Sequence, residues 1–92
     1  MSGVSGKRVH IEVVEAMGSG RCSSELHDVG QSWDLSDAVI PQGMCAWAYN
    51  SIQPFITALY CDGRFPWRDD PVARVCCPDA DNPVVFQISI EQ

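Results

Sequence analysis

The 92-residue chain has the length of one small domain. Its composition, with 46% hydrophobic and 20% charged residues, is that of a globular protein. Twelve acidic residues against six basic ones give a formal net charge of −6. This balance argues against a nucleic-acid partner or an anionic membrane, since both need clustered positive charge. No apolar run in the sequence reaches the roughly 18 residues that a membrane-spanning helix needs.

The five cysteines are the unusual part of the composition. Their number is odd, and the N-terminal residues lack the apolar stretch of a signal peptide, so we do not expect a secreted disulfide framework. We expect a cytoplasmic protein in which the cysteines are thiols, metal ligands or small core residues.

Alternating apolar residues predict strands in the first part of the chain. Residues 1–7 are small and polar, so we expect a flexible N-terminus followed by a single domain over residues 8–92. The first half of residues 8–17 has an apolar, β-branched residue at every second position, which indicates a strand. A second, short strand is expected over residues 29–35, with Trp33 on its apolar side.

A pattern with the period of a helix follows over residues 44–61. Apolar residues recur there at spacings of three and four, which is typical of one helix face. Pro54 lies inside this segment and removes the hydrogen bond to the carbonyl of Asn50. We expect either one helix that is kinked at Pro54 or a second helix that begins with Ser51 as its N-cap.

The last two predicted strands span residues 72–77 and 84–90, and the turn-forming residues 78–83 between them favour an antiparallel hairpin. Apolar and polar side chains alternate along the last strand. One face of the sheet should therefore pack on the helix, and the other should meet water or a second subunit. The order ββαββ predicts an α+β fold with a mainly antiparallel sheet packed on one Pro-kinked helix.

Cys45 stands in the predicted first turn of the helix, where unpaired backbone N–H groups and the helix dipole stabilise an anion. Such a position favours the thiolate, which is the form that attacks electrophiles or binds metals. The alternative is that Cys45 is a small core residue on the apolar stripe that also carries Ala48 and Ile52.

Four residues are candidate zinc ligands. Cys22 and His27 lie five residues apart in an aperiodic segment, a spacing with which a loop can wrap around a metal ion. Cys76 and Cys77 are adjacent on a predicted strand, so they point to opposite faces, and Cys77 is on the apolar side toward the helix. Three thiolates and one imidazole suit a tetrahedral zinc ion, with Cys22, His27, Cys45 and Cys77 as ligands. The spacing matches no standard zinc module, and the alternative is a loop histidine in water beside a half-buried thiol.

A second interpretation is a small enzyme or ligand-binding protein. Cys45 would then be the nucleophile or proton donor, and His27 or Asp79 would move protons. Trp47 and Trp67 would line a pocket for a small apolar ligand, although the tryptophans of so small a domain more often fill the core. For Asp79, which follows a proline in a turn, the alternative role is turn geometry.

A third interpretation is a self-associating domain in which the cysteines are packing residues. The last predicted strand, over residues 84–90, would then be a sheet edge that pairs with a second subunit in a homodimer.

Several stretches together resemble a family of small uncharacterised prokaryotic proteins of about this length. They are residues 9–13, Cys22 with the following histidine and residues 29–30, residues 41–48, the Gly-x-x-Pro-Trp turn at residues 63–67, and residues 76–79 with residues 83–86. The resemblance covers nearly the whole chain. It implies that Cys22, Cys45 and the Cys76–Cys77 pair belong to the family pattern and that Cys61 does not, but it implies no activity.

Overall fold

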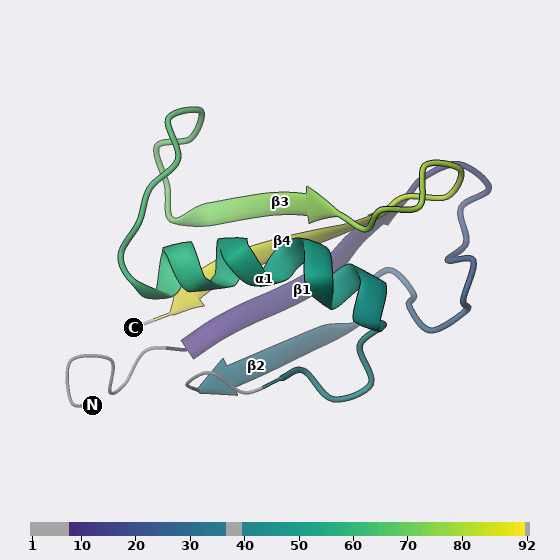
Figure 1. Cartoon of the computed structure of the whole chain (residues 1–92), viewed down its shortest axis with the longest axis horizontal. Coiled ribbons are helices and arrows are strands. Elements are labelled where there is room, and N and C mark those ends of the chain that lie inside the picture. Colours follow the sequence, from purple (N-terminus) through teal and green to yellow (C-terminus); the bar gives the residue numbers. More distant parts are fainter. Residues whose placement is uncertain (1–7, 37–39, 92) are drawn as a thin grey trace.

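One helix and a four-stranded antiparallel sheet form the computed structural model, which describes residues 8–36 and 40–91 (Figure 1). The elements follow the chain as β1 (Arg8–Ala16), β2 (Ser32–Ser36), α1 (Ala46–Tyr60), β3 (Val72–Cys76) and β4 (Val84–Glu91). In space the strand order is β2-β1-β4-β3, and each neighbouring pair is antiparallel. The predicted α+β fold is therefore confirmed, whereas the flexible terminus expected over residues 1–7 lies outside the described residues.

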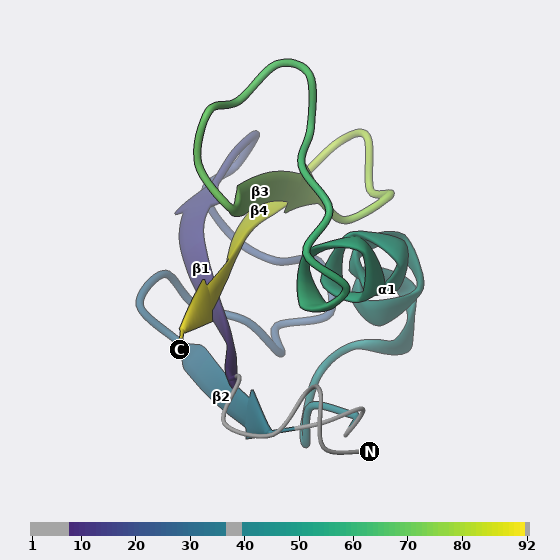
Figure 2. The same ribbon diagram turned by 90° about the vertical axis from the view of Figure 1, so that its left-hand side faces the viewer.

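The sheet presents one apolar face to α1, as the alternation along the strands predicts. Three alternating side chains are buried in each central strand, from Val9 to Val13 in β1 and from Val84 to Ile88 in β4. The register between the two strands places Val13 opposite Phe86. Figure 2 looks nearly along α1 and shows the helix on one side of the sheet, with no helix on the other side. Each large side chain in this core contributes roughly 1.5–3 kcal/mol by leaving water.

The last strand is internal to the sheet, since β4 pairs with β1 on one side and with β3 on the other. The prediction that residues 84–90 form a free edge for a second subunit is therefore wrong. Alternation shows which face of a strand is buried, but it is the same for a central strand and for an edge strand. The edges of this sheet are β2 and β3.

α1 is continuous through Pro54, so the alternative of a second helix that begins after Ser51 is wrong. Pro54 and Asn50 are both exposed, so water can hydrate the carbonyl that loses its helical partner. The opposite side of the helix is anchored in the core by Ile52 and Leu59. At 15 residues, α1 is too short and not apolar enough to cross a bilayer, and the described residues contain no other helix.

β2 begins at Ser32, three residues later than the sequence predicts. Gly30 has a φ of +99°, which interrupts the extended chain. The backbone nevertheless remains attached to β1, because the Gly30 N–H donates to the Val13 carbonyl at 2.9 Å and the Val13 N–H donates to the Gln31 carbonyl at 2.8 Å. This attachment holds the loop between β1 and β2 against the end of the sheet.

Candidate functional site: a pocket lined by three cysteines

Three of the five cysteines, all of which are free thiols, line one pocket of about 390 Å³ beside the N-terminus of α1. The lining residues are Cys22, Ser23, Ser24, Cys45, Trp47, Cys77, Pro78 and Asp79. They come from the loop after β1, the start of α1 and the loop between β3 and β4, which lie at the right-hand end of the molecule in Figure 1. The structure thus brings together three of the four residues that the sequence nominates as zinc ligands.

Hydrogen bonds between the loop after β1 and the loop before β4 hold the pocket together. The Ser23 hydroxyl donates to Asp79 Oδ2 at 2.6 Å, and Asn82 Nδ2 donates to Ser23 Oγ at 3.2 Å. Asn82 Oδ1 accepts from the backbone N–H and the hydroxyl of Ser19 at 3.0 and 2.6 Å. Gly18 permits the close approach, because its φ is +66° and a Cβ there would collide with a backbone carbonyl of the other loop. These contacts fix both loops that carry pocket cysteines.

The carboxylate of Asp79 organises its own loop. Its Oδ1 accepts from the backbone N–H groups of Asp81 and Asn82 at 3.0 and 3.2 Å. The hydrogen bond from the Ser23 hydroxyl, followed by those from the amides of Asn82 and Asp81, lowers the pKa of Asp79 below its usual value. A carboxylate that is stabilised in its ionised form is a weak proton acceptor. This environment favours the turn-geometry role of Asp79 over proton transfer.

Hydrogen-bond donors surround the sulfur of Cys22. Its Sγ lies 3.0 Å from Ser24 Oγ. Burial raises the pKa of the Cys22 thiol, but hydrogen bonds from the Ser24 hydroxyl and from the amides of Ser24, Leu26 and His27 together lower it below its usual value. At a given pH, Cys22 therefore has a larger fraction of thiolate, the nucleophilic form, than an ordinary cysteine.

The turn that supplies these amides contains a non-glycine residue in the left-handed region. Glu25 has a φ of +61°, and its N–H donates to the Cys22 carbonyl at 3.0 Å. The hydrogen bonds that lower the pKa of Cys22 include those from the next two amides, of Leu26 and His27. Successive backbone N–H groups can form anion-binding sites in proteins. The signal for this turn in the sequence is the pair of hydroxyl residues after the cysteine, Ser23 and Ser24, which are not among the predicted site residues.

His27 is buried behind the pocket, and both nitrogens of its ring have partners. The Cys45 backbone N–H donates to His27 Nε2 at 3.1 Å, so Nε2 is an acceptor without a proton. The neutral ring therefore carries its proton on Nδ1, which donates to Gln31 Oε1 at 2.8 Å. Phe86 and Trp33 pack edge-on against the ring at centroid distances of 5.4 and 5.6 Å. This ring is 3% exposed and has no free lone pair for a metal ion or a proton.

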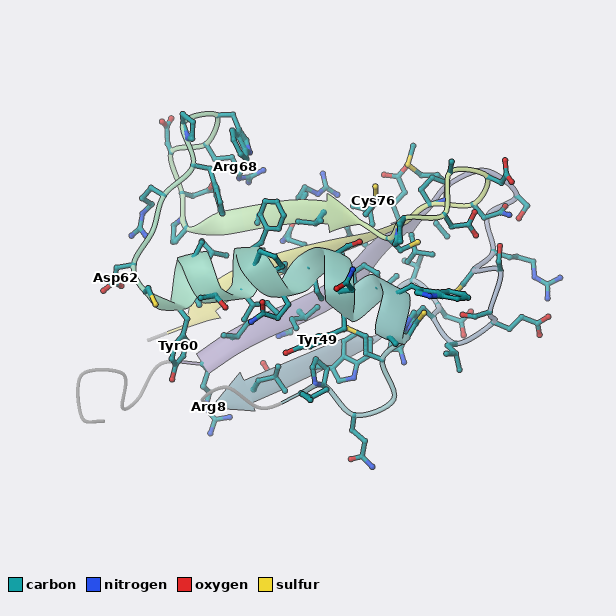
Figure 3. All side chains as sticks on the ribbon, viewed as in Figure 1. Arg8, Tyr49, Tyr60, Asp62, Arg68 and Cys76 are labelled. Atoms are coloured by element: carbon teal, nitrogen blue, oxygen red, sulfur yellow. The ribbon has the colours of Figure 1, made fainter. Side chains whose placement is uncertain are left out.

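The other two pocket cysteines are half-buried at the ends of regular elements. Cys45 is the N-cap of α1 rather than part of its first turn, and its side chain makes no capping hydrogen bond. Cys77 follows β3 and packs against the core, and its Sγ accepts the Val84 N–H at 3.4 Å. Cys76, by contrast, is exposed at the end of β3 (Figure 3). The predicted orientation of Cys77 toward the helix side is confirmed.

Of the two tryptophans that the sequence places in a pocket, Trp47 lines this one and Trp67 does not. Trp47 is in the first turn of α1 and is 74% exposed. Trp67 stacks on Phe65 at a centroid distance of 5.2 Å. Its loop, which also carries Arg68, joins the C-terminal end of α1 to β3 at the opposite end of the molecule (Figure 3). Trp67 is therefore far from the cysteines because it follows the other end of the helix.

The predicted zinc site has little support in this geometry. The described residues contain no group of three or more His, Cys, Asp or Glu side chains placed to hold a metal ion. The thiols of the pocket have the right chemistry for zinc, but the nitrogens of His27 are engaged elsewhere. A zinc ion does not fit the four nominated ligands as they are arranged, and zinc binding stays a prediction from the sequence.

Comparisons with known proteins do not assign this site to a family. No family model matches the chain, and no curated protein or solved structure is significantly similar to it. The resemblance to a family of small prokaryotic proteins therefore stays a prediction. A function has to be inferred from the geometry of the pocket.

Proposed function

We propose that this domain is a thiol-dependent protein that binds a small molecule in the pocket and uses Cys22 as the nucleophile. The observation that carries the proposal is the Ser24 hydroxyl 3.0 Å from the Cys22 sulfur, within a pocket that two further thiols line. The lowered pKa of the Cys22 thiol supports it. A thiolate attacks an electrophilic atom far faster than a thiol does, so this environment supports covalent capture of a ligand.

The supporting roles follow from the contacts of each residue. The side chains of Cys45 and Cys77 form walls of the pocket. His27 accepts the Cys45 N–H on its ring, so it holds the start of α1 against the loop that carries Cys22. The sequence favours Cys45 as nucleophile because of its place at the helix N-terminus. The contact of the Ser24 hydroxyl with the Cys22 sulfur and the lowered pKa of that thiol support Cys22 instead.

Alkylation with iodoacetamide at different pH values tests the proposal. A Cys61→Ser/Cys76→Ser background removes the two exposed thiols and leaves the three pocket cysteines. The thiolate sulfur displaces iodide and forms a thioether, so the rate reports the thiolate fraction, and peptide mass spectrometry identifies the cysteine. We expect Cys22 to react first, with a midpoint at a lower pH than that of N-acetylcysteine. A midpoint at or above that reference would contradict the proposal.

Ser24→Ala in the same background tests whether the Ser24 hydroxyl lowers the pKa of the Cys22 thiol. Loss of the hydroxyl next to the sulfur is expected to raise the midpoint for Cys22 by about 1 pH unit, since a hydrogen bond to a charged group contributes roughly 1.5 kcal/mol or more. Ser32→Ala is the matched control, because Ser32 is exposed on β2 and does not line the pocket. Equal midpoints for the two variants would show that the hydroxyl does not stabilise the thiolate.

Zinc binding predicts a different result in the same assay. A metal ion held by the pocket thiols would protect them from iodoacetamide until a chelator removed it, and the purified protein would contain about one zinc ion per chain. Alkylation of Cys22 at an unchanged rate with and without chelator would leave zinc binding without support.

A further inference from the structure

Trp47 is the most exposed of the large apolar side chains in the described part of the chain. It does not serve the core, because α1 packs against the sheet through another face, which carries Ala48 and Ile52. Its position in the first turn ties it to the helix, two residues after Cys45, and it lines the pocket together with the cysteines. Trp47 therefore gives the pocket a flat aromatic wall and is not needed to fill the core.

The charges at the pocket are negative. Asp79 is the one lining residue with a fixed charge, and a Cys22 thiolate adds a second negative charge. The nearest basic residue in the sequence, Arg21, lies 3.9 Å from the carboxylate of Glu25 and does not line the pocket. With a chain of net charge −6, this distribution disfavours anionic ligands, and the face of a tryptophan favours neutral or cationic ones.

The size of the pocket limits the ligand further. Its volume of about 390 Å³ lies near the lower end of the range for small-molecule sites, which is about 300–1,000 Å³. One ring with a short substituent fits within such a volume.

We infer that the pocket takes a small, flat, aromatic electrophile without negative charge, with its ring on Trp47 and its reactive carbon toward Cys22. This inference rests on the proposed function. For an α,β-unsaturated carbonyl compound, the Cys22 thiolate adds to the β-carbon and forms a C–S bond. The electron pair of the C=C bond moves to give an enolate, which takes a proton from water, so no oxidant or reductant is needed.

Three acrylamides with the same reacting group test this inference: acrylamide, N-phenylacrylamide and 4-acrylamidobenzoate. Each rate at Cys22 is divided by the rate with N-acetylcysteine to remove intrinsic reactivity. We expect N-phenylacrylamide to exceed acrylamide by about threefold to tenfold, as a stacked aromatic pair provides, and to show saturation. We expect the anionic benzoate to lose most of this advantage.

Trp47→Ala is expected to abolish the preference for the phenyl compound, and Trp67→Ala is the matched control. Trp67 is 68% exposed, close to the 74% of Trp47, but it lies in the loop between α1 and β3 and does not line the pocket. As a second measurement, unreactive acetanilide should protect Cys22 of the unmodified chain from iodoacetamide, whereas acetamide should not.

The results separate the two proposals. Equal normalised rates for acrylamide and N-phenylacrylamide, or equal effects of the two tryptophan substitutions, would overturn the inference while leaving Cys22 as nucleophile. Failure of Cys22 to react ahead of Cys45 and Cys77 with iodoacetamide would overturn the proposed function, and the inference with it.

Discussion

Replacement of His27 by leucine removes the one polar side chain that the structure buries in the core among the described residues. Leucine fills much of the same space, but it has no acceptor for the Cys45 N–H and no donor for Gln31. The substitution therefore separates the hydrogen bonds of His27 from its packing.

The loss in stability can be worked out from these contacts. A buried N–H without an acceptor costs about 1–3 kcal/mol. The edge-on contacts of the ring with Trp33 and Phe86 are each worth about 0.5–1.5 kcal/mol, of which leucine recovers a part by packing. We expect His27→Leu to lower the free energy of unfolding by roughly 2–4 kcal/mol, which leaves a typical domain of this size folded.

Urea denaturation followed by circular dichroism measures this loss, and thermal melting should show a drop of about 4–8 °C for each kcal/mol. His27→Gln is the control, because the glutamine oxygen can still accept the Cys45 N–H, and we expect it to lose about half as much. A loss below about 1 kcal/mol for His27→Leu would show that the buried hydrogen bonds contribute little. Destabilisation of the unsubstituted protein, but not of His27→Leu, by a chelator would instead identify His27 as a metal ligand.

Three further predictions test the fold. Gly18→Ala should lower the free energy of unfolding by more than about 2 kcal/mol in urea denaturation, because φ is +66° and a Cβ would collide with backbone. Gly20→Ala, where a Cβ has open space, should lower it by about 1 kcal/mol. Equal losses for the two variants would contradict this prediction. Pro54→Ala should raise the melting temperature, since it restores a helical hydrogen bond and relieves a cost of about 3 kcal/mol, and an unchanged or lower value would refute this. The pKa of Asp79 is lower in the folded protein than the ordinary value of 3.8, so its carboxylate stabilises the fold at pH values above 3.8. This contribution is lost as the pH falls through the folded-state pKa. Between pH 5 and pH 2 the unsubstituted protein should therefore lose more stability than Asp79→Asn, as acid denaturation monitored by circular dichroism would show; parallel curves for the two proteins would exclude the effect.

The elements of this fold could be predicted because they depend on local periodicity. A repeat of two along residues 84–90 and a repeat of three to four along residues 44–61 report which side of each element is buried, whatever packs against it. The position of β4 inside the sheet could not be predicted in this way, because it depends on pairing with β1, more than seventy residues earlier. Alternation is the same with one neighbouring strand or with two.

The chemistry of the site could also be predicted from the sequence only in part. The sequence shows that thiols are available, and the alternation near Cys77 shows which of the adjacent pair faces inward. The environment that supports Cys22 as the proposed nucleophile includes a left-handed turn at Glu25, and left-handed conformations of non-glycine residues have only weak signals in a sequence. The sequence favours Cys45 instead, because a helix end is easy to recognise.

The role of His27 was decided by tertiary structure alone. In the sequence it is a loop histidine five residues from a cysteine, which is equally compatible with a metal ligand and with an exposed residue. Burial against Phe86 and the hydrogen bond from Cys45 both arise from segments distant along the chain, and they leave the ring without a free nitrogen. The sequence by itself determined the elements, the buried faces and the supply of thiols, because these follow from residue type and local period. Only the tertiary structure decided which thiols line one pocket and which polar group is buried, because these depend on contacts between distant segments.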